Sequence, residues 1–358
     1  MTRTFFTLST FCGFLLLAGS SRAADEKQIQ RAIDNGVLAL KGLQSREGTW
    51  RHTHIGATAL AGLTLLECGE SPKSDCIKKA AQSVRGSSVG LTHTYSISLA
   101  IMFLDKLGDP ADIPLIESLT VRLLAGQNAR GGWTYYCPAI GADEVRRLTR
   151  LLKQRNELKA GVGDLGKRKP GRRTVKDLSP EIKQQLRLIN RLAPARGGRG
   201  GMIRDDNSNT QFATLGLWVG RRHGLPVNQA LARVDARFRQ SQKPSGGWGY
   251  VLWEQKMRGG PLVTVPDGQP NDGVASTAAM TCAGLLGLAI NHGAVNEVGG
   301  KKRNLKKDRS LNAGLLALST AIGLPKDPRR FMQLVPKIQR SNGTAYYFLW
   351  SVERVGVA

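Results

Sequence analysis

The stretch that decides the fold is Gln127-Asn128-Ala129-Arg130-Gly131-Gly132-Trp133, which returns as Gln242-Lys243-Pro244-Ser245-Gly246-Gly247-Trp248. A looser copy spans residues 44–50 and ends in Trp50, and a degenerate copy at 339–344 lacks the Trp. We call this pattern the Gln-to-Trp motif. Each copy follows a segment with helical spacing and comes before a small-residue-rich apolar helix, directly or after an intervening segment. A repeat of this kind indicates an architecture of paired helices.

The residue types of the motif indicate a structural role. A Gly pair permits a turn with positive φ, which other residues resist. The Trp can bury a large apolar surface where two helix pairs meet. The Gln both donates and accepts hydrogen bonds, so it can tie the end of one helix to the next turn or helix start. We therefore expect the motif to join helices and to carry no chemistry.

Two kinds of helix alternate along the chain. One kind is amphipathic, and the other is apolar nearly all round and therefore buried. The five expected pairs span residues 25–69, 72–107, 111–224, 227–291 and 310–356. This pattern predicts an all-α protein over residues 24–358, an α/α toroid of about five hairpins with inner and outer helices.

Residues 138–204 interrupt the alternation and are predicted to be a basic, partly disordered insertion. Residues 145–204 hold 18 Lys and Arg against 4 Asp and Glu, a large part of the chain's net charge of +25. Short helices are expected at about 143–158 and 180–192. An anionic envelope surface is the predicted partner of residues 159–200, with a solvated loop as the alternative. No nucleic-acid partner is expected, because the segment lacks interleaved aromatic residues.

The amino terminus predicts export. A basic start, an apolar run from Phe5 to Ala18 and small residues near Ala23 are typical of a secretory signal peptide over residues 1–23. The expected location is periplasmic or extracellular, with a membrane-anchored amino terminus as the alternative. No later stretch is expected to be long and apolar enough to span a membrane. Four cysteines remain after cleavage, of which Cys68 and Cys76 either pair or stay free.

The motifs and the helices that follow them resemble the prenyltransferase and squalene oxidase repeat family, within the terpenoid cyclase/protein prenyltransferase superfamily. The resemblance covers most of the chain outside the insertion. It implies a toroid and makes apolar, isoprenoid-like molecules the first ligand class to test. Family toroids close with six helix pairs, so five pairs imply an open or truncated ring. A homo-oligomer or a partner protein at the open carboxyl end would then cover apolar helix faces.

The catalytic signatures of the superfamily are incomplete in this sequence. The Asp-x-Asp-Asp-Thr-Ala signature of triterpene cyclases has its nearest counterpart in residues 203–210, which hold Asp205 and Asp206. The Asp, Cys and His pattern of the prenyltransferase zinc site is missing. Cys68-Gly69-Glu70-Ser71 has Ser where the thioester signature has Gln. No metal and no cofactor is predicted, because Cys-x-x-Cys and His-x-x-x-His spacings are also missing.

Candidate site residues lie near the starts of the inner helices. The candidate acids are Asp205, Asp206 and Asp272; the first two can share a proton or cap a helix, and Asp272 can be a turn residue. The candidate ligand-binding residues are His54, His93, Tyr95, Phe212 and Tyr346. The leading hypothesis is an exported protein that binds an apolar ligand or a partner segment in its central cavity. The alternatives are a terpenoid cyclase or prenyltransferase-type enzyme that uses Asp205 and Asp206, and an envelope-associated protein.

Overall fold

A computed structural model describes residues 25–51, 54–160, 173–191, 205–251, 276–297, 304–322 and 344–357. Within these ranges every regular element is a helix, joined by isolated β-bridges. The predicted all-α class is confirmed. The predicted signal peptide, the degenerate motif at 339–344 before Thr344 and the candidate acid Asp272 lie outside the described residues.

The chain divides into two compact units, Met1–Gly42 and Leu43–Ala358. The described part of the first unit is helix α1 (Glu26–Gly42), which is amphipathic and has no buried residue. All that follows concerns the second unit.

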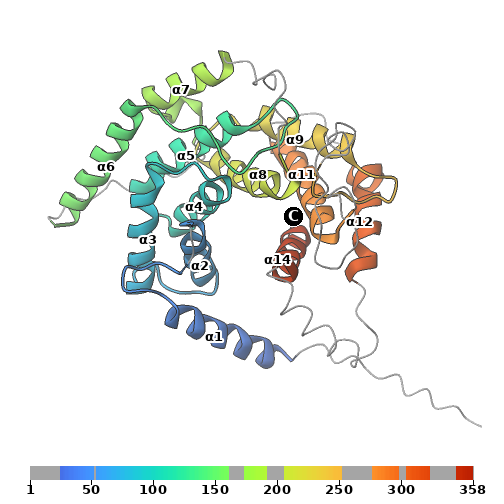
Figure 1. The fold of residues 1–358 in the computed structure, drawn as a ribbon, viewed down its shortest axis with the longest axis horizontal. Helices are drawn as coiled ribbons and strands as arrows, with labels where there is room; N and C mark the ends of the chain where they lie inside the picture. The colour runs from blue at the N-terminus through green and yellow to red at the C-terminus, as the bar shows by residue number, and fades with distance from the viewer. Residues whose placement is uncertain are drawn as a thin grey trace, which may run out of the picture. The chain divides into compact units, whose positions relative to one another are not determined.

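One set of helices in the second unit makes consecutive contacts (Figure 1). The set consists of α2 (Gly56–Glu67), α4 (Thr94–Leu107), α8 (Asn207–Arg222), α11 (Ala278–Glu297) and α14 (Thr344–Val357). Helix α2 packs against α4, α4 against α8, α8 against α11, and α11 against α14. These are the helices expected to be buried, and we call them the inner helices.

The second set packs on the first. It consists of α3 (Asp75–Ser88), α5 (Ile113–Gly126), α9 (Asn228–Ser241) and α12 (Arg309–Ile322). Helix α3 contacts α2 and α4, α5 contacts α4 and α8, α9 contacts α8 and α11, and α12 contacts α11. Helix α5 departs from the amphipathic expectation, because nine of its residues from Leu115 to Leu123 form one continuous buried run. We call this set the outer helices.

The three copies of the Gln-to-Trp motif that end in Trp, at residues 44–50, 127–133 and 242–248, have the same turn structure. Each Gln side chain donates through Nε2 to two carbonyls, one of the first Gly of its own copy and one near the start of an outer helix. The acceptors are Gly48 and Cys76 for Gln44, Gly131 and Ala230 for Gln127, and Gly246 and Ser310 for Gln242. The first Gly of each copy has a positive φ, between 77° and 83°. The predicted roles of the Gln and of the turn are therefore confirmed.

The Trp of the motif is a core residue. Trp133 and Trp248 are fully buried. Trp133 Nε1 donates to the Leu123 carbonyl at 2.7 Å, and Trp133 N lies 3.3 Å from Thr210 Oγ1. The motif at 127–133 thus connects three helices. It follows the end of α5, its Trp133 contacts the start of α8, and its Gln127 bonds to α9.

The insertion contains the two expected helices, α6 (Ala142–Ala160) and α7 (Pro180–Arg191). Helix α7 packs against α5. Helix α6 is fixed by Arg155, whose Nη1 lies 2.9 Å from Asp112 Oδ1, and Asp112 also binds Arg85 at 2.6 Å. The described part of the insertion is therefore packed onto the outer helices, while residues 161–172 and 192–204 lie outside the described residues.

One helix corrects an expectation. Residues 278–296 of α11 are long and apolar enough to cross a membrane by length and composition alone. Helix α11 nevertheless packs against α8, α9, α12 and α14, and most of that segment is buried inside the protein. This pattern is typical of the core helix of a globular protein.

Candidate functional site

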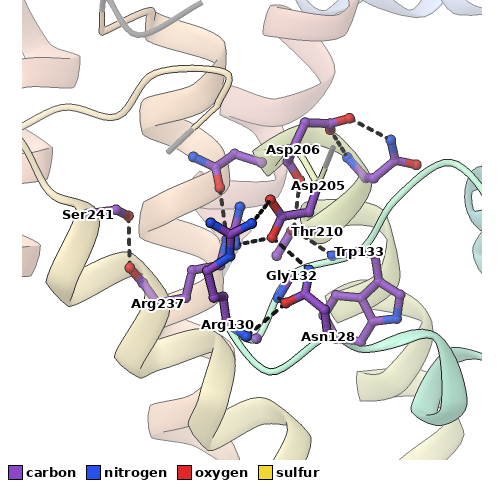
Figure 2. A network of polar contacts seen from close by, with 12 residues as sticks. Asn128, Arg130, Gly132, Trp133, Asp205, Asp206, Thr210, Arg237 and Ser241 are labelled. Carbon is purple, nitrogen blue, oxygen red and sulfur yellow. Dashed lines mark hydrogen bonds and ion pairs between the residues drawn. The ribbon is translucent and has the colours of Figure 1, made fainter. Parts of the chain in front are cut away.

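Asp205 belongs to a buried polar network next to the Gln-to-Trp motif at residues 127–133 (Figure 2). Its Oδ2 accepts from Arg237 Nη1 at 2.7 Å and from Asn128 Nδ2 at 2.8 Å. Both members of the ion pair are buried, and Arg130 adds a second cation 3.7 Å from Asp205 Oδ1. Burial lowers the pKa of Arg237, and the Asp205 carboxylate opposes that shift. Asp205 is thus bound by two arginines and an asparagine inside the folded protein.

Asp206 caps helix α8. Its Oδ1 accepts from the Asn209 amide at 2.6 Å, and its Oδ2 accepts from Asn209 Nδ2 at 2.8 Å. Burial raises the pKa of the Asp206 carboxyl above its usual value, although the bonds from Asn209 and from Tyr250 act in the opposite direction. The two neighbouring acids bind different partners, Arg237 for Asp205 and Asn209 for Asp206 (Figure 2).

Aromatic rings gather at the starts of the inner helices. His54, before α2, stacks on His93, before α4, with ring centroids 4.1 Å apart and planes 9° apart. His93 also lies 5.7 Å from the ring of Tyr95. Tyr95 meets Phe212 of α8 edge to face at 4.9 Å. Phe212 in turn stacks on Trp350 of α14 at 4.8 Å and 5°.

We call this continuous set the aromatic row. Its members, linked by ring contacts, are His54, His93, Tyr95, Tyr135, Tyr136, Phe212, Tyr347 and Trp350. They come from α4, α8, α14, the residues just before α2 and α4, and the loop after the motif at 127–133. Four of the five candidate ligand-binding residues therefore lie side by side.

Hydroxyl groups form a chain along the same row. Tyr95 Oη donates to Ser208 Oγ at 2.7 Å, and Ser208 Oγ donates to Tyr347 Oη at 3.1 Å. Tyr347 Oη then donates to Gln211 Oε1. Burial is the main cause that raises the pKa of Tyr95, and it raises the pKa of Tyr347 to about 12. These phenols stay protonated at neutral pH and can donate hydrogen bonds.

Part of the row is open to solvent. Tyr135 is 44% exposed, and its neighbour Tyr136 is 62% exposed. Tyr135 Oη lies 2.8 Å from Tyr250 Oη, so the loops after two different motifs meet here. Burial and then the carboxylate of Asp206 raise the pKa of Tyr250, and Asp206 acts in the same direction on the pKa values of Tyr95 and Tyr347 of the row.

The structure separates the predicted site residues into three groups. His54, His93, Tyr95 and Phe212 come together, and Asp206 lies beside them. Tyr346 is 61% exposed and makes none of the ring contacts found among the described residues; the neighbouring Tyr347 takes that place. Asp205 is bound to Arg237, and Asp272 lies outside the described residues.

Sequence reasoning missed Tyr250. A signal for it exists, because Trp133-Thr134-Tyr135 and Trp248-Gly249-Tyr250 place a Tyr at the same distance after each Trp. The two tyrosines that meet are therefore equivalent positions of the repeat. Tyr135, Tyr347 and Trp350 have a sequence context that is also typical of core residues, so the sequence alone does not single them out.

Among the residues that the structure describes, no group of three His, Cys, Asp or Glu side chains could hold a metal ion. The four cysteines outside the signal region are free thiols, so the alternative in which Cys68 and Cys76 stay unpaired holds in this structure.

No protein-family model matches the chain, and no curated protein matches it in a sequence search.

Proposed function

We propose that the second unit is an α/α-toroid-type binding protein, similar to terpenoid cyclases, whose aromatic row binds an apolar, isoprenoid-like ligand. The contacts between successive inner helices, with outer helices packed on them, support the toroid. The single observation that carries the function is the convergence, on one partly exposed surface, of rings from the first half of four inner helices or from the residues just before them.

The chemistry of the row suits such a ligand. Aromatic rings offer large apolar contact areas at a small cost in conformational entropy. Their faces also attract positive charge, which is the reason that aromatic walls favour allylic or cationic groups. The hydroxyl chain of Tyr95, Ser208 and Tyr347 supplies a few fixed polar groups, as is usual in pockets for largely apolar ligands.

The test is the binding of farnesol to the full chain, measured by isothermal titration calorimetry. Trp350→Ala removes a ring that stacks on Phe212 and should weaken binding by roughly 3- to 10-fold, the usual value of one aromatic contact. Trp218→Ala is the matched control, since Trp218 is also half-buried and lies under an Arg, but makes no ring contact with the row among the described residues. The proposal fails if wild type does not bind farnesol, or if both variants weaken binding equally.

A second candidate function is acid catalysis by Asp206 on the same ligand class. Asp206 is buried at the start of an inner helix beside the row, and burial raises the pKa of its carboxyl, as a general acid requires. Wild type should then convert a linear isoprenoid into a cyclic or hydrated product, and Asp206→Asn should abolish turnover while binding is kept. A wild type that binds but never turns the substrate over rules this candidate out.

Export, and an anionic envelope partner for residues 159–200, remain predictions from the sequence. Half of that basic segment and all of the predicted signal lie outside the described residues.

A further inference from the structure

A cavity of about 600 Å³ lies among α5, α6, α7 and residues 138–141. None of its lining residues belongs to the aromatic row or to the Asp205 network. Pockets that hold small molecules usually have volumes of about 300–1,000 Å³. The insertion thus creates, with α5, a space of ligand size outside the site proposed above.

Part of the lining is apolar. Val121 and Ala125 of α5 lie on one side, and Leu188 and Ile189 of α7 line the cavity as well. Leu188 is 51% exposed, so apolar surface faces the open space. A ligand with an apolar body would remove this surface from water, at about 25 cal/mol per Å².

The charged groups of the lining are mostly paired with one another. Its cations are Arg122, Arg146, Arg147 and Arg150, and its anions are Asp143, Glu144 and Glu181.

Two of these anions are neutralised within α6. Asp143 binds Arg146, and Glu144 holds Arg147 through two bonds of 2.7 Å. Hydrogen bonds from its own backbone amide and from Ser179 lower the pKa of Glu181, so this acid is ionised at the start of α7.

Arg122 is a buried cation in which one N–H donor has no hydrogen-bond acceptor among the described residues. Its Nη1 donates to the carbonyls of Ser88 and Leu91 at 2.8 Å each, and its Nη2 lies 3.4 Å from Ser118 Oγ. Its Nε is buried and finds no acceptor among the described residues. Burial lowers the pKa of Arg122 to about 10, which leaves it charged at neutral pH. A buried donor without an acceptor costs about 1–3 kcal/mol, so an acceptor at this position would be stabilising.

Arg150 is the second available cation. It is exposed, lines the cavity and forms no ion pair with another described residue. Outside the two pairs of α6, the lining holds Arg122 and Arg150 against Glu181, so its remaining charge is net positive and lies beside apolar surface.

We propose that this cavity binds a small amphiphile with an anionic oxygen head. The head accepts from Arg122 and Arg150, and the apolar body covers Val121, Ala125 and Leu188. This site is independent of the aromatic row and of the function proposed for it.

The experiment uses laurate, added to the full chain below its micellar concentration and measured by calorimetry. Saturable binding is expected, and dodecylammonium, with the same tail and the opposite charge, should not bind. Arg150→Gln should weaken laurate binding by about 10-fold, the usual effect of losing a hydrogen bond to a charged group. Leu188→Asp should weaken it at least as much. Arg187→Gln removes an equal charge from α7 outside the lining and should have no effect.

Three results would overturn the proposal. The first is the lack of saturable laurate binding by wild type. The second is an equal loss in Arg187→Gln and Arg150→Gln, which would indicate general charge attraction. The third is binding to phosphatidylglycerol vesicles without binding of free laurate. That result would mean that the site recognises the anionic head groups of a membrane surface and not a free amphiphile. Trp350→Ala should leave laurate binding unchanged, so failure here and failure at the aromatic row are distinguishable.

Discussion

Asp205 and Asp206 differ in environment although they are adjacent in sequence. The partner of Asp205 is Arg237 on α9, and the ion pair joins the start of α8 to an outer helix. The partner of Asp206 is Asn209 in the first turn of its own helix. A sequence shows two acids before a helix, but only the distant Arg237 decides which carboxylate is committed to the fold.

The buried ion pair gives the first prediction. Asp205→Asn leaves Arg237 buried without its counter-charge and should destabilise the protein by about 3–5 kcal/mol. Urea unfolding followed by circular dichroism measures this change. Asp75→Asn is the control, because Asp75 forms an exposed pair with Lys78 at 3.8 Å and should change stability by less than about 1 kcal/mol. Equal effects of the two variants would contradict the role given to Asp205.

The cysteines give the second prediction. Burial raises the pKa of the Cys137 thiol to about 11 and that of the Cys282 thiol to about 12, and Cys68 is exposed. Because only the thiolate reacts, iodoacetamide at about pH 8 should label Cys68 in the native protein and spare Cys137 and Cys282. Mass spectrometry of the peptides shows the sites, and urea should make all of them reactive. Native labelling of Cys137 as fast as Cys68 would refute the buried environment.

At the scale of elements, the Gln-to-Trp motif was predictable because its chemistry is local. Gly supplies the positive φ, and the Gln reaches a turn four residues away. The two classes of helix were also predictable, since amphipathic spacing separates outer from inner helices. The aromatic row was predictable only in part. The bond from Tyr95 to Ser208 joins residues 113 positions apart, and no local pattern shows such a pairing.

The choice between Tyr346 and Tyr347 illustrates the same limit. Successive helical residues point about 100° apart, so only one of the two can face α8. The sequence does not show which face of α14 meets the inner helices. Tyr347 is the one that bonds Gln211 and stacks near Phe212.

The turn glycines give the third prediction. Gly131 has a φ of 77°, and a Cβ there would lie 2.4 Å from the Arg233 carbonyl oxygen. Gly69 has a φ of 89° but open space around its would-be Cβ. Gly69→Ala should therefore cost only the conformational strain, roughly 1–2 kcal/mol. Gly131→Ala should cost clearly more, because the outer helix α9 must also move. Thermal unfolding of both variants measures the difference, and equal costs would refute the close contact between motif and α9.

At the scale of the molecule, the last helix pair leaves apolar surface exposed. Leu315 and Leu316 of α12 and Leu349 and Val357 of α14 are each at least half exposed among the described residues. A large apolar surface favours association. We predict that the protein forms a homo-oligomer or binds a partner through this end, and that Leu316→Glu shifts it toward the monomer. Native mass spectrometry checks this, and a stable wild-type monomer at micromolar concentration would instead favour a ring closed by five pairs.

The most direct test of the binding function is photo-crosslinking with a farnesol analogue that carries a diazirine. The full chain is irradiated with the probe, with and without excess farnesol, and the labelled peptides are sequenced by mass spectrometry. The account predicts labels that farnesol suppresses on α4, α8 and α14, at or beside Tyr95, Phe212 and Trp350. Labels that farnesol does not suppress, or labels confined to α6 and α7, would contradict it.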